Sequence, residues 1–163
     1  MPVYYLESSG LFKHYRIEKG TDILNTLFSE KSETEVFVTS HLVTVEIEAA
    51  VARGFKTKVL NRQAYGVLLR SFAEDLEAMI VLPVSTALIS EAAQQARQHE
   101  LRALDAIHFA TALRASQAAP GPLVFVASDK DLLSAARSSG FIVLDPEEPG
   151  TLQQLRNLRQ AGL

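Results

Sequence analysis

Short apolar runs rich in β-branched and aromatic residues alternate with longer helical patterns along this chain of 163 residues. The runs at residues 3–6, 35–39 and 122–128 are almost continuously apolar, which is typical of strands buried on both faces of a parallel sheet. Shorter extended pieces are expected at 81–84 and 141–146. This order of elements predicts an α/β fold, a three-layer sandwich around a central, mostly parallel sheet with right-handed crossovers.

Apolar residues recur at helical spacing between these strands. Helices are expected after Thr21, after Ser40, and over residues 57–80, 85–100, 101–116 and 129–140. No linker or repeat divides the chain, so residues 1–146 are predicted to form a single domain. Residues 147–163 are expected to be a C-terminal tail that could form a short helix.

Composition excludes several classes of protein. Charged residues make up 21% and hydrophobic residues 47%, which is a globular balance. There is no cysteine, which argues against disulfides and thiolate zinc sites. The N-terminus lacks a signal-peptide pattern, and no apolar run approaches the roughly 20 residues that span a bilayer, so a cytoplasmic protein without a membrane segment is expected. The net charge of −3 argues against broad phosphate binding, but leaves room for a nucleic acid held at a local patch.

Four acidic residues stand where reactive groups are expected. Glu7 follows the first strand and Asp129 follows the strand at 122–128, and the carboxyl ends of parallel strands gather at one edge of a sheet. Glu46 and Asp105 lie inside apolar helical stretches, LVTVEIEAAVA and LRALDAIHFATAL. Acids in such surroundings are hard to keep ionised without a partner.

Each acid also has an ordinary structural interpretation. Asp129 could cap a helix, and Glu46 could lie on a solvated helix face. Asp105 could form a buried salt bridge to Arg102 or Arg114, and the acid after the first strand could accept backbone N–H groups.

The four acids together favour a metal site over these separate interpretations. Carboxylates that converge on one pocket repel each other, and a hard divalent cation is the usual compensation. Oxygen ligands without cysteine favour Mg²⁺ or Mn²⁺ over Zn²⁺. Such a cluster suits phosphoryl chemistry, in which a metal-bound water attacks a phosphate.

The residues around these acids resemble the PIN-domain ribonucleases of the VapC toxin type. That family opens with a strand followed by Asp-x-Ser-x-Leu-x-Lys-x-Tyr, and residues 7–15 here read ESSGLFKHY. The family's helical Glu corresponds to Glu46, its Leu-Asp-Ala-Ile-His-Leu-Ala-Thr-Ala motif to LDAIHFATA around Asp105, and its Thr-x-Asp motif to ASD ending at Asp129. The resemblance covers nearly the whole chain.

The resemblance implies a PIN-like fold and Mg²⁺- or Mn²⁺-dependent endonucleolytic cleavage of RNA. It also implies a homodimer and a small cognate antitoxin, so that the chain would be the toxin of a toxin–antitoxin pair. In the corresponding hypothesis Glu7, Asp105 and Asp129 hold a metal ion, and Glu46 orients a bound water or helps hold a second ion. Ser9 is a candidate to hold these ligands in position by hydrogen bonds without contacting the metal itself.

Two positions depart from the family pattern. Glu7 replaces the leading Asp, and its extra methylene can shift a ligand away from the strict octahedral geometry of Mg²⁺. Ala127 stands where a Thr hydroxyl is common, which removes a hydrogen bond behind the ligands. The alternative is therefore a catalytically impaired PIN-fold dimer that binds its antitoxin or RNA without cutting. A phosphatase of the Asp-x-Asp kind is excluded because no second acid follows Glu7 at that spacing.

Basic residues near the first motif have two interpretations. Lys13, His14 and Arg16 could contact the RNA backbone, and a solvated helix face explains them equally well. His108 lies on an apolar helix and is expected to be a hydrogen-bonded core residue. An apolar groove near residues 57–80 would be consistent with an antitoxin site.

Overall fold

The computed structural model describes residues 2–162, and within them five strands form a single sheet in the order β3-β2-β1-β4-β5. Every neighbouring pair is parallel. The strands are β1 (Val3–Leu6), β2 (Val36–Ser40), β3 (Ile80–Leu82), β4 (Leu123–Val126) and β5 (Ile142–Leu144). The predicted α/β sandwich with a parallel sheet is confirmed, and each expected extended segment overlaps one of these strands.

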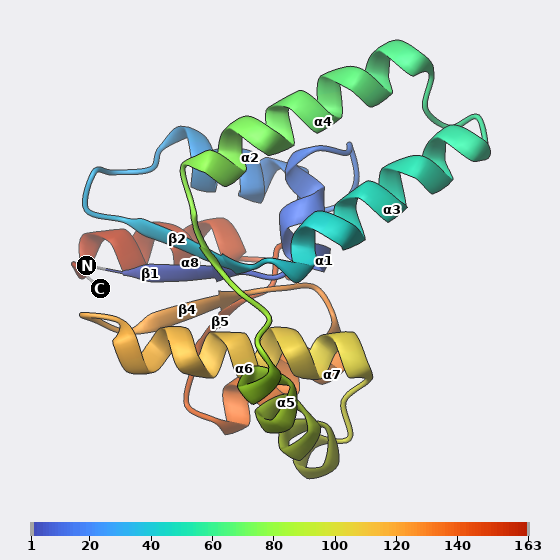
Figure 1. Ribbon diagram of the computed structural model, residues 1–163. Coiled ribbons are helices and arrows are strands. Elements are labelled where there is room, and N and C mark those ends of the chain that lie inside the picture. The colour runs from blue at the N-terminus through green and yellow to red at the C-terminus, as the bar shows by residue number, and fades with distance from the viewer. Residues whose placement is uncertain (1, 163) are drawn as a thin grey trace.

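Helices cover both faces of the sheet and complete three layers (Figure 1). One face carries α1 (Ser8–Leu11), the 3-10 turn η1 (Phe12–His14), α2 (Thr21–Ser29), α3 (Leu42–Lys56), α4 (Arg62–Glu77) and α8 (Thr151–Gln160). The other face carries α5 (Thr86–His99), α6 (Ala103–Ala118) and α7 (Lys130–Ser138). Among residues 2–162 no helix has the length and apolar character to cross a bilayer.

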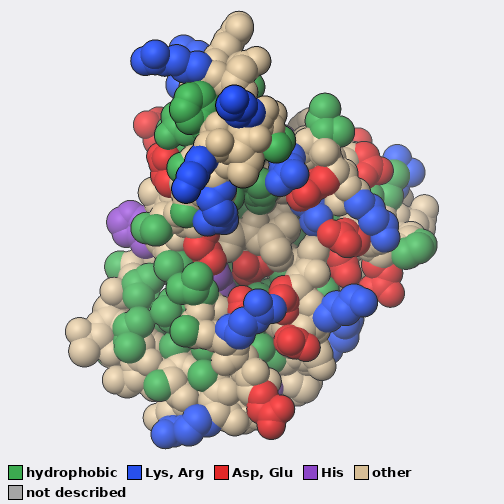
Figure 2. All heavy atoms as spheres, turned by 90° about the vertical axis from the view of Figure 1, so that its right-hand side faces the viewer, with side chains coloured by type: hydrophobic (Ala, Val, Ile, Leu, Met, Phe, Trp, Pro, Cys, Tyr) green, Lys and Arg blue, Asp and Glu red, His purple; other side chains and the backbone are tan. Residues whose placement is uncertain are grey.

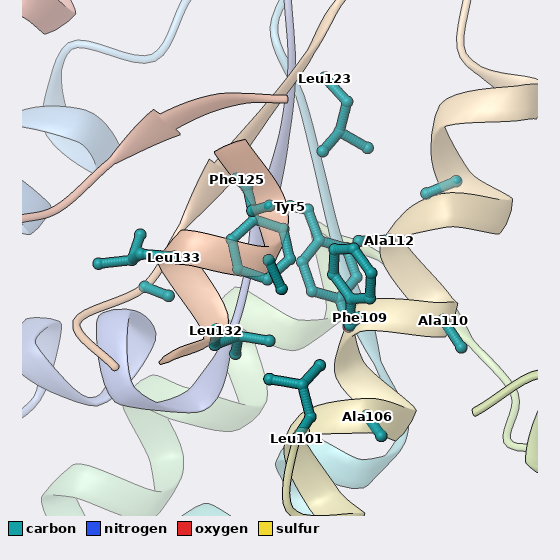
Figure 3. Close-up of a cluster of buried hydrophobic side chains, with 14 of the residues drawn as sticks. Tyr5, Leu101, Ala106, Phe109, Ala110, Ala112, Leu123, Phe125, Leu132 and Leu133 are labelled. Atoms are coloured by element: carbon teal, nitrogen blue, oxygen red, sulfur yellow. The ribbon is translucent and has the colours of Figure 1, made fainter. Parts of the chain in front are cut away.

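The central strand β1 supplies a buried side chain to each of two cores. Tyr5 faces α6 and stacks on Phe125 at a ring separation of 5.3 Å, with Phe109 beside them (Figure 3). Tyr4 faces the opposite layer and meets Phe37 edge to face at 5.8 Å. Successive residues of a strand point to opposite faces. Two cores therefore require the continuous apolar run that the sequence shows.

The helices α3 and α4 form an arm that projects beyond the sheet (Figure 1). A single helix is predicted over residues 57–80, but α4 begins only at Arg62. Lys58 adopts a positive φ of 60°, which ends the preceding helix, and Asn61 caps the next one by accepting the Ala64 N–H at 2.8 Å. The turn between the two helices thus lies at the tip of the arm.

Gly10 allows α1 to approach the end of β4. A Cβ at this position would lie 2.9 Å from the Val126 carbonyl oxygen, which is closer than real Cβ atoms come to other atoms, and a tight 3.3 Å from Ala127 Cα. The helix that follows β1 is therefore pressed against the chain leaving β4. This close contact positions the loops that carry the acidic residues.

The segment after β5 contributes to the core. Leu155 is fully buried and Leu158 is nearly so, and α8 packs against α2 and β5. The boundary between the domain and the tail at residue 146 stays a prediction.

Candidate functional site

Acidic side chains gather in a hollow at the carboxyl edge of the sheet, flanked by basic side chains (Figure 2). The hollow is a cavity of about 450 Å³. It is lined by Glu7, Ser8, Ser9, Phe12, Lys13, Glu18, Glu46, Ile47, Ala50, Arg53, Ser128, Asp129 and Glu147. A second cavity of about 270 Å³ lies between β2, β3 and α6, but its walls are almost entirely apolar and hold no acid. Of these two cavities, only the first is lined by acidic side chains.

Glu7 lies directly after β1 and is only 4% exposed. It caps α1, because its Oε2 accepts the Ser9 backbone N–H at 2.9 Å and also the Ser9 hydroxyl. Its Oε1 accepts the Ser8 hydroxyl at 2.9 Å. These hydrogen bonds hold the buried carboxylate of Glu7 in one orientation.

Ser9 joins the ends of the two central strands. Its hydroxyl donates to Glu7 and accepts the Ser128 backbone N–H at 2.9 Å. Ser128 directly precedes Asp129, which caps α7 by accepting the Leu132 N–H at 3.0 Å. Asp129 therefore caps α7 and lines the cavity at the same time.

Asp105 lies in the first turn of α6, close to Asp129 but outside the cavity lining. Arg102 lies between the two acids, 3.6 Å from Asp105 Oδ2 and 3.5 Å from Asp129 Oδ2. Of the two arginines considered from the sequence, Arg114 instead pairs with Glu91 at 2.7 Å. The Arg102 contacts are long and its side chain is 78% exposed, so this cation only partly compensates the acids.

The pKa of Asp105 reflects this incomplete compensation of charge. Burial, together with the negative charges of Asp129 and Glu7, raises the pKa of the Asp105 carboxyl to about 6, against the opposing effect of Arg102. A divalent cation among these three acids would relieve that repulsion.

Glu46 enters a hydrogen-bonded network that the sequence did not predict. Its Oε2 accepts a hydrogen bond from His108 Nε2 at 2.7 Å, and the Ser8 hydroxyl lies 2.6 Å from the same oxygen. The other ring nitrogen of His108 lies 2.9 Å from the Tyr5 hydroxyl. His108 is fully buried, so the expectation of a hydrogen-bonded core histidine is confirmed. That histidine is also linked to the cavity.

The pKa values of this pair move in opposite directions. Burial would lower the pKa of His108, but the hydrogen bond to Glu46 and the charges of Glu7, Glu46 and Asp105 raise it above its ordinary value. Burial would raise the pKa of Glu46, but the His108 hydrogen bond and charge and the Ser8 hydroxyl lower it. The two groups therefore favour an imidazolium–carboxylate pair.

Ser8 bridges the first and second acids. Its hydroxyl lies within hydrogen-bonding distance of Glu7 Oε1 and Glu46 Oε2, and it has one proton to donate. The family pattern leaves this position unspecified. Only the folded arrangement of α1 against α3 shows its role.

The basic residues after the first motif differ in environment. Lys13 is buried and paired with Glu147 at 2.6 Å, so the solvated-face interpretation is wrong for this residue. His14 stacks on Phe28 at 4.1 Å, and Arg16 is exposed. Lys13 and Glu147 both line the cavity of the acids.

The donor chemistry of the acids fits a divalent metal ion. Within residues 2–162 no three Asp, Glu or His side chains are already drawn together at metal-ligand spacing. Within these residues the Ser8 hydroxyl is the only donor within hydrogen-bonding distance of Glu7 Oε1, which leaves a lone pair of that oxygen for a ligand bond. Asp105 Oδ2 and Asp129 Oδ2 make only long contacts with Arg102, and Asp129 Oδ1 accepts the Leu132 N–H that caps α7, so these oxygens are further candidate ligands. All-oxygen donors with net negative charge are those that Mg²⁺ and Mn²⁺ prefer.

The model of one protein family matches most of the chain. Residues 4–138 match the PIN domain, a span that begins within β1 and ends with α7. The chain belongs to the PIN domain family. The match includes all four acids named from the sequence.

Individual relatives agree with this assignment. The chain is 27% identical over 150 residues to "Ribonuclease VapC45" of Mycobacterium tuberculosis, covering 90% of this chain and 100% of that protein. Among solved structures, PAE2754 from Pyrobaculum aerophilum superposes with a TM-score of 0.61 at 19% identity, covering 98% of this chain and 96% of that one. VapBC2 from Rickettsia felis, bound to a DNA fragment from its promoter, gives a TM-score of 0.59 at 13% identity over 88% of this chain and 98% of that one. The predicted resemblance to VapC-type PIN proteins is confirmed.

Proposed function

We propose that this PIN-domain protein is a Mg²⁺- or Mn²⁺-dependent endoribonuclease, the toxin of a toxin–antitoxin pair. The observation that carries the proposal is the group of Glu7, Asp105 and Asp129 at the carboxyl edge of the sheet, where burial and the charges of Asp129 and Glu7 raise the pKa of Asp105 to about 6. Similarity to a ribonuclease of the VapC type over 90% of the chain supports the choice of RNA as substrate.

In the proposed mechanism each acid has a separate task. Glu7, Asp105 and Asp129 would hold the metal ion, directly or through water, at the carboxyl edge of the sheet. When bound, the ion lowers the pKa of a coordinated water and offsets charge on the scissile phosphate. Ser9 holds Glu7 in place and fixes its distance from the loop of Asp129.

Glu46 takes a supporting part in this mechanism. The His108 and Ser8 hydrogen bonds fix its Oε2 toward the network behind the cavity. We propose that its carboxylate orients a water at the edge of the metal site, and that no separate histidine base is needed.

The decisive experiment measures cleavage of RNA by the purified protein without antitoxin, with Mg²⁺ and Mn²⁺ titrated separately. The expected result is cleavage that requires a divalent ion and disappears in Asp105→Asn. Cleavage that continues unchanged in Asp105→Asn, or in EDTA, would show that the metal assignment is wrong.

A second candidate function rests on Glu7 itself. All the hydrogen bonds that cap α1 hold this longer side chain in place, and its extra methylene changes where a metal would lie relative to Asp129. A PIN-fold dimer that binds RNA or its antitoxin without cutting is the corresponding proposal. Glu7→Asp separates the two: activity that appears only in this variant identifies an intact scaffold disabled at one ligand.

We further propose that a small antitoxin binds along the α3–α4 arm. Phe55, Val59 and Val67 are exposed there, and a cavity lies between Ala52, Phe55, Arg62 and Tyr65. An amphipathic segment could cover this apolar surface. Solved relatives such as VapBC2 contain a toxin–antitoxin complex, which supports a protein partner.

The proposed cellular setting is the cytoplasm, where RNA and a cognate antitoxin would be encountered. We propose that the chain forms a homodimer, as the resemblance to VapC-type proteins implies. Sedimentation equilibrium of the purified protein tests this, and a mass of about 17.9 kDa at all concentrations would contradict it.

A further inference from the structure

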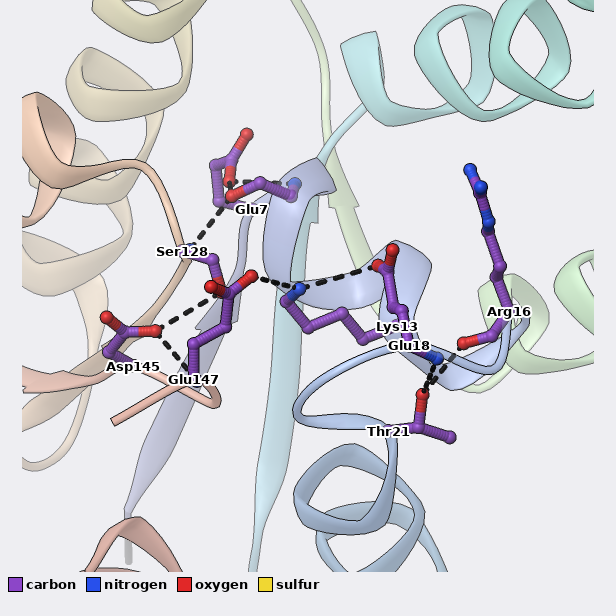
Figure 4. Close-up of polar contacts among 9 residues, drawn as sticks. Glu7, Lys13, Arg16, Glu18, Thr21, Ser128, Asp145 and Glu147 are labelled. Carbon is purple, nitrogen blue, oxygen red and sulfur yellow. Dashed lines mark hydrogen bonds and ion pairs between the residues drawn. The ribbon is translucent and has the colours of Figure 1, made fainter. Parts of the chain in front are cut away.

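Lys13 carries a buried positive charge beside the acidic cavity. Its side chain is 5% exposed and lies in the η1 turn after α1. A buried ammonium needs anionic partners, because leaving it unpaired is costly. Its Nζ lies 2.6 Å from Glu147 and 3.4 Å from Glu18 (Figure 4).

Glu147 comes from a distant part of the chain and is the more exposed member of its ion pair with Lys13. It lies in the loop between β5 and α8, and its side chain is 42% exposed. Asp145 Oδ1 accepts the Glu147 backbone N–H at 2.9 Å and the Ser128 hydroxyl at 3.3 Å. The backbone of Glu147 is therefore tied to the loop of Asp129, while its carboxylate can leave Lys13 by a change of side-chain rotamer.

Lys13 lines the same cavity as Glu7 and Asp129. Among the described residues that line this cavity, five are acidic, namely Glu7, Glu18, Glu46, Asp129 and Glu147, whereas Lys13 and Arg53 are basic. A polyanion that enters such a cavity is repelled by the acids. Movement of the Glu147 carboxylate would remove one of them from the cavity and uncover a cation in the same step.

We propose that Lys13 binds a backbone phosphate of the RNA next to the scissile one, and that the carboxylate of Glu147 occupies this phosphate site until RNA displaces it. The inference rests on the proposed ribonuclease function, and it names the residue pair through which this chain restricts access to its own site. A carboxylate and a phosphate oxygen offer the same hydrogen-bond acceptors to an ammonium. The hydrogen bond from Lys13 also lowers the pKa of Glu147, so the competing group is anionic at neutral pH.

The test compares Glu147→Gln with Glu148→Gln. Both variants remove one negative charge from neighbouring positions of the same loop. Glu148 is 3.6 Å from Arg137 and does not line the cavity, so it is a matched control for the general change in charge. The probe is a fluorescein-labelled pool of single-stranded RNA of random sequence, and its Kd is measured by anisotropy with the full chain in EDTA.

Glu147→Gln is expected to lower the Kd by roughly three- to fivefold relative to Glu148→Gln, the size expected when one competing ion pair of this kind is removed. Lys13→Met should abolish the difference between the two variants. Lys13→Arg keeps the charge and should retain the difference, which provides a second background if Lys13→Met folds poorly.

Equal Kd values for Glu147→Gln and Glu148→Gln would overturn the proposal. The proposal would also be overturned if Glu147→Gln lowered the Kd by the same factor in a folded Lys13→Met protein, or if no variant bound RNA. Cleavage is measured separately with Mg²⁺ and Mn²⁺. If RNA is cleaved but Glu147→Gln and Glu148→Gln bind it with equal Kd, the role of Lys13 is wrong and the nuclease function stands. If Glu147→Gln binds RNA more tightly but no variant cleaves it, the nuclease function is wrong and the competition between Glu147 and RNA for Lys13 stands.

Discussion

The imidazole of His108 lies 2.7 Å from the carboxylate of Glu46, so an ion pair between α6 and α3 lies directly behind the candidate site. The two residues are separated by 62 positions in sequence. His108 is fully buried, whereas the Glu46 side chain is 22% exposed toward the cavity. The pair therefore connects the core of the molecule to an acid that the chemistry is proposed to use.

His108→Gln should destabilise the protein more than Glu46→Gln. Loss of the imidazolium leaves a half-buried carboxylate without its cation, which is expected to cost about 2–3 kcal/mol. Glu46→Gln leaves a neutral histidine with a hydrogen-bond acceptor, at a cost of about 1 kcal/mol. Urea unfolding at pH 6 measures both. If Glu46→Gln lost more unfolding free energy than His108→Gln, the histidine would not be acting as the cation that compensates the charge of Glu46.

The contribution of this pair should depend on pH in a defined direction. The pKa of His108 is raised above 6.5, so its contribution to stability is complete below about pH 6.5 and is lost as the pH rises through the folded-state pKa. The pKa of Glu46 is lowered below 4.5, so its contribution is present above about pH 4.5 and is lost as the pH falls through the folded-state pKa.

The difference in unfolding free energy between the wild type and Glu46→Gln should therefore be largest between about pH 4.5 and 6.5 and should shrink at higher pH. Thermal or urea unfolding of both proteins across pH 4–9 provides the curve. A difference that grows steadily from pH 6 to pH 9 would contradict the assignment of a charged pair.

Asp105→Asn should stabilise the metal-free protein at pH 8. Burial and the charges of Asp129 and Glu7 raise the pKa of Asp105 to about 6, so the folded state loses stability as the pH rises from the ordinary value of 3.8 through 6. Removing the charge should recover about 1–2 kcal/mol in EDTA at pH 8, less than the full pKa shift corresponds to because solvent screens this half-buried carboxylate, and less again at pH 5.

The same variant should lose the stabilisation that Mn²⁺ or Mg²⁺ gives to the wild type, because binding to the folded state is what raises the melting temperature. Differential scanning fluorimetry with and without each ion measures both effects. Asp131→Asn, at an exposed position on α7, is the control and should keep the response to metal. An unchanged metal response in Asp105→Asn would remove this residue from the ligand set.

Gly10→Ala should destabilise the protein by about 2 kcal/mol or more, because overpacking against backbone atoms cannot be relieved by a rotamer change. The new Cβ would meet the Val126 carbonyl oxygen at 2.9 Å. Gly66→Ala is the matched control, since Gly66 lies in α4 with nothing within 4 Å of its Cβ position. That substitution should stabilise by about 0.5–1 kcal/mol. Equal effects in chemical unfolding would show that α1 is free to move away from β4.

The sequence was most informative where chain order alone determines position. Glu7 and Asp129 each follow a strand, and the ends of parallel strands meet at one edge whatever the details of packing. The two apolar tyrosines of β1 likewise predicted burial on both faces, since adjacent residues of a strand point in opposite directions.

Relationships between distant helices were not predictable in this way. The hydrogen-bond partner of Glu46 is set by how α6 lies against α3. Nothing in the local sequence around His108 distinguishes a residue that pairs with Glu46 from an ordinary core residue. The burial of Lys13 depends on a loop 134 positions away in the sequence. The family motif marked Lys13, but only the folded loop shows which carboxylate it meets.

The two outermost strands, β3 and β5, are each three residues long. An exposed sheet edge recruits strands from other molecules through its unpaired N–H and C=O groups, and such short edges offer few of them. Extension of the sheet from one molecule to the next is therefore disfavoured. Self-association of this chain should instead use helical surfaces, where specificity comes from side chains and not from the backbone.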